Sequence, residues 1–215
     1  MKEISPGVFV EKGKIFTKNL VPGKKVYGER LIKIKGIEYR QWSPYKSKTA
    51  AALKSGLKKL PLNPDSRVLY LGASQGTTPS HFSDIAYKGE IYCIELSPRN
   101  AVKLYDICLD RKNMIPIIED ATHPENYQIK GEFDILYQDI SQKEQAKIIL
   151  KNLHLLKKGG FLMMAIKARS ISQKENKKQI FKRELSLLEP YFKIISKIDI
   201  HRYEKDHLFI VGIKK

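Results

Sequence analysis

The pattern of apolar and polar positions changes near residue 46. Before that point, short apolar stretches are separated by glycine turns, and residues 31–40 place apolar and basic side chains at alternate positions. A period of two puts one face of a strand on a core and the other face toward solvent. Residues 1–45 therefore predict a small N-terminal β domain.

Beyond residue 46, helix-like and strand-like segments alternate. The predicted helices are residues 46–60, 78–87, 98–110, 142–156 and 174–189. The predicted strands are residues 68–72, 90–96, 114–120, 133–140, 161–168, 192–200 and 207–213. Several strands are almost continuously apolar, which is typical of parallel strands buried on both faces. Residues 46–215 therefore predict an α/β domain with a doubly wound, mostly parallel sheet, and the two final strands predict an antiparallel terminal hairpin at one edge.

Composition narrows the class of protein. Hydrophobic residues make up 42% of the chain, which suits a globular protein with a proper core. No apolar run reaches the roughly 18 residues of a membrane span, and the first residues lack the apolar segment of a secretory signal. We therefore expect a cytoplasmic protein with no membrane partner. Cys93 and Cys108 lie in apolar segments and are expected to be buried and reduced.

Charge is more informative. The chain carries 40 Lys and Arg against 23 Asp and Glu, a net charge of +17. This excess predicts a polyanionic partner, most simply a nucleic acid. The alternative is a lysine-rich surface with no such partner, because the basic residues are spread along the chain. Charge alone does not say which nucleic acid would bind.

Residues 72–76, GASQG, connect the first predicted strand of the α/β domain to a helix. The glycines at both ends permit a positive φ and a close approach of ligand to backbone. Thr77 or Thr78 is predicted to cap the helix, and Pro79 suits its first turn. Free N–H groups at such a helix start favour an anionic group. The alternative is a tight turn with no ligand.

Three acidic residues follow successive predicted strands. Glu95 comes roughly 20 residues after Gly72, where an acid commonly binds ribose hydroxyls. Asp120 and Asp139 end the next two strands. Each could be a helix cap or a solvated turn residue, but three at one sheet edge predict a nucleoside site. A dinucleotide is disfavoured because GASQG lacks the G-x-G-x-x-G spacing.

Eight segments, in this order, carry a resemblance to a known family. They are VYGERL, YRQWSPYKSKTAAAL, LGASQGTTPSH, IYCIELSPR, IIEDATHPENY, DILYQDISQ, GGFLMMAIKARSI and YEKDHLFIVGI. Nearly the whole chain resembles the archaeal fibrillarin-like RNA 2′-O-methyltransferases. The resemblance implies a Rossmann-like methyltransferase domain that uses S-adenosyl-L-methionine (SAM), joined to a small N-terminal β domain.

The resemblance implies a role for several residues in SAM binding. Thr77 and Thr78 would contact the methionine end together with the loop that begins at Gly72. Glu95 would hold the ribose hydroxyls, and Leu96 would lie against the adenine. The adenine edge would be recognised by the 120–121 pair, and Asp139 with its following residues would flank the sulfonium. The implied cofactor-binding residues are Gly72, Ala73, Thr77, Thr78, Glu95, Leu96, Asp120, Ala121, Asp139, Ile140, Ser141 and Gln142.

Leu96 departs from the family pattern, because relatives usually carry an aromatic residue there. Leucine still covers the adenine face by apolar contact, but a stacking contribution of about 0.5–1.5 kcal/mol is absent. We expect weaker SAM binding without loss of activity.

The resemblance also implies a catalytic group of Lys48, Asp139, Lys167 and His207. A ribose 2′-hydroxyl is a poor nucleophile, so the enzyme must align it and help to remove its proton. Lys167 lies at the end of an apolar strand, where a lowered pKa would let it act as base, and Lys48 would supply a neighbouring positive charge. Asp139 and His207 would orient the ammonium group.

Each of these residues also has a simpler interpretation. Lys48 could begin a solvated helix, and His207 could be a hydrogen-bonded histidine of an edge strand. No Cys/His cluster has metal-ligand spacing, so no catalytic metal is predicted.

The resemblance implies 2′-O-methylation of ribosomal RNA or tRNA, with the site chosen by base pairing to a C/D box guide RNA. It also implies a Nop-family scaffold protein and a kink-turn-binding, ribosomal-protein-like partner. Choice of the target nucleotide by a guide RNA suits this chain, because its sequence has no RNA-recognition signature of its own. Two alternatives remain open: a non-catalytic RNA-binding module on a methyltransferase scaffold, and a protein side-chain methyltransferase.

Overall fold

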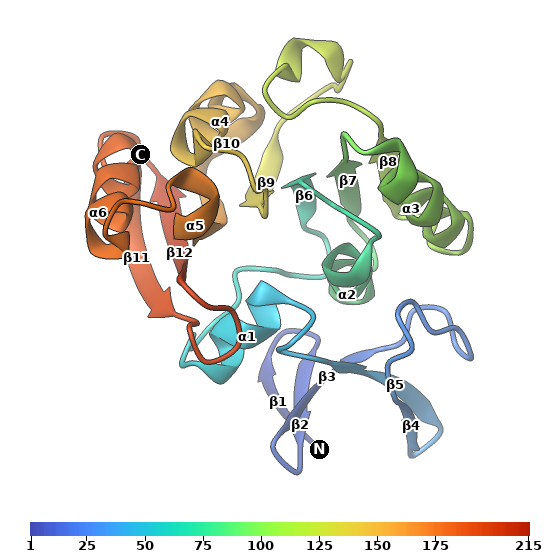
Figure 1. The fold of residues 1–215 in the computed structure, drawn as a ribbon. Coiled ribbons are helices and arrows are strands. Elements are labelled where there is room, and N and C mark those ends of the chain that lie inside the picture. The colour runs from blue at the N-terminus through green and yellow to red at the C-terminus, as the bar shows by residue number, and fades with distance from the viewer.

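The computed structural model describes residues 1–215 and contains two separate sheets (Figure 1). The first is antiparallel and has the order β1-β2-β3-β5-β4. Its strands are β1 (Lys2–Ser5), β2 (Val8–Glu11), β3 (Lys14–Lys18), β4 (Leu31–Ile34) and β5 (Ile37–Trp42). The boundary predicted between residues 45 and 46 falls between the two sheets, and the two-domain division stays a prediction.

The second sheet has seven strands in the order β11-β12-β10-β9-β6-β7-β8. They are β6 (Arg67–Leu71), β7 (Glu90–Ile94), β8 (Met114–Ile117), β9 (Phe133–Gln138), β10 (Leu156–Lys167), β11 (Phe192–Asp199) and β12 (His207–Lys214). Strands β10, β9, β6, β7 and β8, which are neighbours in this order, are parallel. Strand β12 is antiparallel to both of its neighbours. The predicted mostly parallel sheet with an antiparallel terminal hairpin is confirmed.

Helices cover both faces of the seven-stranded sheet. They are α1 (Lys48–Lys54), α2 (Thr77–Ile85), α3 (Pro98–Asp110), α4 (Gln145–Lys151), α5 (Ala168–Ile171), α6 (Lys177–Leu188) and the 3-10 turns η1 (Pro124–Asn126) and η2 (Leu153–Leu155). Alternate residues of β6 enter two cores: Val68 packs with α1, α2 and α3, whereas Leu69 packs with α4, α5 and α6. The near-continuous apolar strands are therefore buried on both faces, as predicted. Cys93 and Cys108 are buried free thiols, also as predicted.

Some predicted boundaries were wrong. The helix predicted over residues 46–60 ends at Lys54, because Gly56 adopts a φ of 109°, which only glycine takes easily. The helix predicted over 142–156 is α4 followed by η2, and β10 begins at Leu156 with an irregular register before Phe161. Neither β1 nor α5 was predicted as a separate element. None of the helices is both long and apolar enough to cross a membrane.

Buried charges join the N-terminal sheet to the helices of the larger sheet. The carboxylate of Asp84 in α2 accepts hydrogen bonds from Thr17 Oγ1 (2.6 Å), the Leu20 backbone N–H (3.0 Å) and Arg111 Nη1 (2.6 Å). Arg40 of β5 lies between Asp84 and Glu29, with its Nε 2.9 Å from Glu29 Oε1. All of these side chains are buried, so the contact between the two sheets depends on matched charges as well as on apolar packing.

Asp84→Ala is expected to lower the free energy of unfolding by about 3–5 kcal/mol, because two buried guanidinium groups lose their shared partner. Denaturant unfolding followed by circular dichroism measures this change. Asp65→Ala, which removes an exposed carboxylate in a turn, is the matched control and should stay within about 0.5 kcal/mol of the wild type. Equal effects of the two substitutions would contradict the role assigned to Asp84.

Candidate active site

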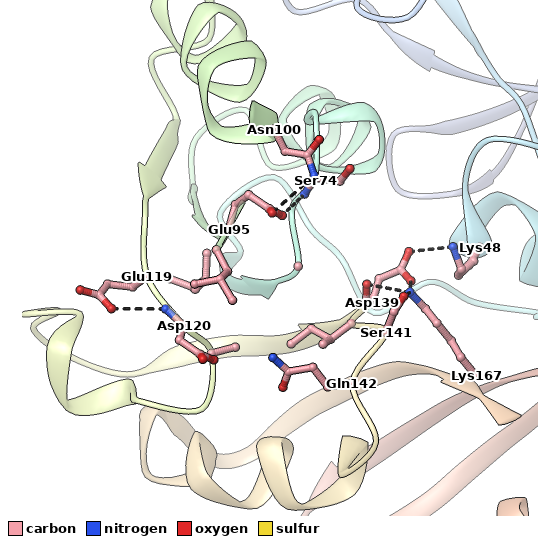
Figure 2. Close-up of a pocket in the computed structure, with 15 residues that line it drawn as sticks. Lys48, Ser74, Glu95, Asn100, Glu119, Asp120, Asp139, Ser141, Gln142 and Lys167 are labelled. Carbon is pink, nitrogen blue, oxygen red and sulfur yellow. Dashed lines mark hydrogen bonds and ion pairs between the residues drawn. The ribbon is translucent and has the colours of Figure 1, made fainter. Parts of the chain in front are cut away.

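A pocket of about 330 Å³ opens at the carboxyl ends of the parallel strands (Figure 2). Parallel strands place their carboxyl ends at one edge, so residues distant in sequence meet there. The pocket is lined by Lys48, Gly72, Ser74, Ile94, Glu95, Leu96, Asn100, Glu119, Asp120, Ala121, Asp139, Ile140, Ser141, Gln142 and Lys167.

The loop after β6 passes very close to the loop after β9. Gly72 has a φ of 82°, and a Cβ placed on it would lie 2.9 Å from the Asp139 carbonyl oxygen and 3.0 Å from Ile140 Cγ1. Both the backbone angle and the space therefore require glycine. Gly76 also has a positive φ, of 80°. Both glycines permit a positive φ, as noted from the sequence, and both adopt one.

Glu95 holds the loop after β6 in place. Its Oε2 accepts a hydrogen bond from the Ser74 backbone N–H at 2.7 Å, and its Oε1 accepts one from the Ser97 N–H at 2.8 Å. A carboxylate has about four lone-pair sites, so the side chain can accept further hydrogen bonds from a ligand in the pocket. Ser74 has a φ of 50°, which turns its N–H toward Glu95.

Asp120 occupies another side of the pocket, next to Glu119 and Gln142 (Figure 2). Burial is the largest single cause and raises the pKa of its carboxyl, but hydrogen bonds from Thr122 and Gln142 and the charge of His123 together outweigh burial, so the net pKa is lowered. The Thr122 backbone N–H donates to Asp120 Oδ1 at 2.8 Å. Asp120 is therefore a charged hydrogen-bond acceptor at neutral pH.

Asp139 lies between two lysines (Figure 2). Its Oδ1 is 2.6 Å from Lys167 Nζ, and its Oδ2 is 3.1 Å from Lys48 Nζ. Lys167 Nζ also donates to the Asp139 carbonyl oxygen at 2.9 Å and to Ser141 Oγ at 3.1 Å. The ammonium group of Lys167 is thus fixed in direction by three oxygens.

The pKa of Lys167 is lowered from its ordinary value. Burial is the largest cause, since only 7% of the residue is exposed, and the positive charge of Lys48 lowers the pKa further. Asp139 acts in the opposite direction but does not reverse the shift. A larger fraction of Lys167 is therefore neutral at a given pH than for a lysine in water.

His207 lies directly across from Lys167 in the antiparallel pair of β10 and β12. Its Nδ1 donates to the Lys205 carbonyl oxygen at 2.7 Å, which leaves Nε2 free to accept. Burial lowers the pKa of His207, so the neutral imidazole is favoured. His207 does not line the pocket itself, but it stands next to the residue that does.

Ala73, Thr77 and Thr78 also lie outside the lining of the pocket. The Thr78 hydroxyl donates to Ser47 Oγ at 3.0 Å, and Ser47 caps α1. The predicted threonine cap of α2 was wrong: the N-cap is Gly76, which has no side chain to offer. Thr78 instead connects α2 to the start of the helix that carries Lys48.

Several pocket residues were missed by sequence reasoning. Ser74 contributes a backbone N–H, and Asn100 sits in the first turn of α3 beside Glu95, where polar residues are common and carry no signal. Glu119 precedes a predicted acid and could have been found from that position. Glu204 does not line the pocket, but its carboxylate lies 4.0 Å from Lys48 Nζ, and it comes from the β11–β12 turn, which no sequence spacing connects to α1.

No group of three or more His, Cys, Asp or Glu side chains is arranged to hold a metal ion. The pocket offers acidic acceptors on one side and a buried lysine beside a carboxylate on the other.

Comparison with known proteins gives a family for this fold and this site. The fibrillarin family model matches residues 1–215. A Methanocaldococcus jannaschii protein named fibrillarin-like rRNA/tRNA 2′-O-methyltransferase is 50% identical, over 99% of this chain and 96% of its own.

Two solved structures are also similar to this chain. Aeropyrum pernix fibrillarin, in complex with natively bound S-adenosyl-L-methionine, is 43% identical with a TM-score of 0.86, covering 93% of this chain and 88% of its own. The fibrillarin of a fibrillarin/Nop5p complex is 37% identical with a TM-score of 0.90, covering 100% of both chains. With one family model matching its whole length, this chain belongs to the fibrillarin family.

Proposed function

We propose that this protein is a SAM-dependent methyltransferase that modifies ribose 2′-hydroxyls in ribosomal RNA and tRNA. The observation that carries the proposal is the position of Lys167 and Asp139 at the rim of an acid-lined pocket, on the same sheet edge. The names of its relatives give the substrate class, and the bound SAM of the Aeropyrum pernix structure gives the cofactor.

The pocket residues fit SAM in chemical terms. The ribose hydroxyls are donors, and Glu95 is a buried carboxylate with acceptor sites that Ser74 and Ser97 leave unused. Asp120 is a charged acceptor suited to the amino group of adenine, beside Ala121. Leu96 offers an apolar face, since 55% of the residue is exposed at the pocket. Ile140, Ser141 and Gln142 complete the wall next to Asp139.

Thr77 and Thr78 fit a ligand less directly than the resemblance implies. They begin α2, whose N-terminus faces the loop from Gly72 to Ser74, but neither side chain reaches the pocket lining. We assign the loop backbone, including Ala73, to the methionine end of the cofactor. The hydroxyl of Thr78 acts through Ser47 on the position of α1.

When bound, SAM supplies a methyl group that is activated by a positively charged sulfur. Lys167, in its neutral form, accepts the proton of the ribose 2′-hydroxyl at Nζ. Asp139 Oδ1, at 2.6 Å, stabilises the ammonium that results. Ser141 Oγ and the Asp139 carbonyl hold Nζ in one direction, which limits the loss of alignment during the reaction.

Lys48 and His207 act on the pKa and orientation of Lys167. Lys48 occupies the second oxygen of Asp139 and disfavours a positive charge on Lys167. His207 faces Lys167 from the neighbouring strand with a free Nε2. Both are positioning residues in this proposal, because neither is needed to accept the proton.

The RNA partners and assembly are proposed on separate grounds. The net charge of +17 supports contact with a nucleic-acid backbone. The fibrillarin/Nop5p complex supports a scaffold partner of that family for this chain. A C/D box guide RNA and a kink-turn-binding protein complete the assembly that we propose, because the chain has no base-reading module of its own.

Lys167→Ala is expected to reduce methyl transfer by about 10²–10⁴-fold, because the proton acceptor is lost, while SAM binding is retained. Transfer of labelled methyl from SAM to a guide-paired target RNA measures the rate, in the presence of the scaffold and kink-turn proteins. A target with a single 2′-deoxy nucleotide at the modified position should take no label.

Two further variants make that result specific. Lys167→Arg keeps the positive charge beside Asp139 but cannot release a proton, so it should be as inactive as Lys167→Ala. Lys158→Ala, at the other end of β10, should behave as the wild type. Substantial activity in Lys167→Arg would reject Lys167 as the base, and absence of label with wild-type protein in the complete assembly would reject the proposed function.

Lys48→Ala is expected to raise the pKa of Lys167, since it removes a neighbouring positive charge and leaves Asp139 to Lys167 alone. Because the neutral amine is the active form, the rise of activity with pH should move to higher pH. NMR titration of the lysine side chains checks the pKa directly. Lys46→Ala, an exposed lysine two residues away, should leave the titration unchanged; a lowered or unmoved pKa in Lys48→Ala would contradict this role.

Leu96→Phe is expected to tighten SAM binding by about two- to tenfold, because an aromatic ring can stack on adenine. Isothermal titration calorimetry with SAM measures the change. Val102→Phe places the same ring on the exposed face of α3 and should leave the affinity as it was. No gain in Leu96→Phe would place the adenine elsewhere.

A further inference from the structure

A second hollow, of about 450 Å³, has no hydrophobic residue in its lining, and Arg169 lines it two residues beyond Lys167 in the chain. We call it the basic hollow. Its cations come from the segment after β10, the start of α6 and the β11–β12 turn. It is lined by Arg169, Glu175, Asn176, Lys177, Lys178, His201, Lys205 and Asp206, and Glu175 is paired with Arg183.

One buried carboxylate organises the basic hollow. Asp206 has a φ of 58°, and its oxygens are each 3.0 Å from a cation: Arg169 Nε and Lys177 Nζ. These two hydrogen bonds lower the pKa of Asp206 to about 2, so it is fully charged at neutral pH. Asp206 pairs with two of the cations, Arg169 and Lys177. Lys178 and Lys205 line the same hollow and form no ion pair. The hollow is therefore preformed and retains positive charge.

The basic hollow is tied to the catalytic residues through the backbone. The Ala168 N–H donates to the Asp206 carbonyl oxygen at 3.1 Å, one residue beyond Lys167. The Lys205 carbonyl accepts the hydrogen bond that fixes His207. The same turn brings Glu204 to Lys48, and Figure 1 shows this turn, in red, next to α1. An anion held in the hollow would thus contact the chain segments that also carry Lys167 and His207.

We propose that the basic hollow binds backbone phosphates of the RNA strand that carries the acceptor ribose. This rests on the proposed function and deepens it, because it names how the substrate strand is placed. Phosphate oxygens are the natural ligands of clustered Lys and Arg side chains, and such contacts set position without reading sequence. A protein partner would seek apolar or aromatic anchors, which this hollow lacks.

The test compares two double variants with the same loss of charge. Lys178→Ala with Lys205→Ala removes the two unpaired lysines and leaves the Asp206 pairs intact. Lys158→Ala with Lys193→Ala is the control, since these exposed lysines begin β10 and β11 at the opposite end of the sheet. Lys158 is roughly 30 Å from Lys167 at about 3.3 Å per residue.

Binding of a fluorescein-labelled guide–target RNA duplex is measured by anisotropy over a range of salt concentrations. We expect the hollow variant to lose about tenfold in affinity, and its slope of log K against log salt to fall by about 1 for each lysine. SAM affinity and the thermal midpoint should match the wild type. The control pair should keep the salt slope. Equal losses in both pairs, or no loss in the hollow variant, would overturn the proposal.

A neutral methylphosphonate linkage next to the acceptor nucleotide locates the contact. With this RNA, the hollow variant and the wild type should bind equally, because the charge partner is already gone. An undiminished difference would mean that the lysines contact some other group, and the proposal would fail. Loss of binding to the Nop-family scaffold protein with unchanged RNA affinity would likewise overturn it, by assigning the hollow to a protein partner.

This experiment separates the two proposals. If the wild type transfers no methyl group but the salt slope depends on Lys178 and Lys205, the hollow binds RNA and the methyltransferase proposal fails. If methyl transfer is normal and the slope does not depend on these lysines, only the inference about the hollow fails.

Discussion

The buried carboxylate of Asp84 is the constraint on which the arrangement of this protein depends. It neutralises Arg111 beside it and joins β3 of the small sheet to α2 of the larger one. Leaving a charge unpaired in this position would cost several kcal/mol, which favours the arrangement in which Asp84 meets Arg40 and Arg111. α1 follows directly from β5, and its start is fixed by Ser47 and Thr78. The position of Lys48 therefore depends on the Ser47–Thr78 contact at the start of α1 as well as on its ion pair with Asp139.

The pocket contains two kinds of carboxylate, which differ in the groups that they contact. Glu95 and Asp120 accept hydrogen bonds from backbone N–H groups and remain available to a ligand. Asp139 is different, because both of its oxygens are committed to lysines. Burial lowers the pKa of Lys167, and the charge of Asp139 partly offsets this by stabilising the protonated form. The basic hollow lies beyond the end of the strand that carries Lys167, where we infer that it holds phosphates of the RNA strand.

Much of the fold could be predicted because its strands and turns are locally encoded. The apolar runs around Leu69 and Leu136 predict strands buried on both faces, and the glycines of residues 72–76 predict the turn at the pocket. The predictions of helix ends and caps were wrong where the local sequence pattern does not decide the backbone conformation. Residues 46–60 remain helix-like in composition, yet the helix stops at Lys54 because the chain must turn at Gly56. Thr78 is a good cap residue by type, but α2 begins at Thr77 after Gly76, so Thr78 lies inside the first turn and its hydroxyl donates to Ser47.

The sequence by itself determined the alternation of strands and helices, the acids at successive strand ends and, through family resemblance, the candidate lysines. Only the tertiary structure decided which groups act on one another. Glu204 and Lys48, or Asp206 and Arg169, are brought together from separate elements by the β11–β12 turn. Periodicity records which face of an element is buried, whereas distances between charges depend on how the elements pack. A pKa shift such as that of Lys167 follows from burial and neighbouring charge, and both exist only after folding.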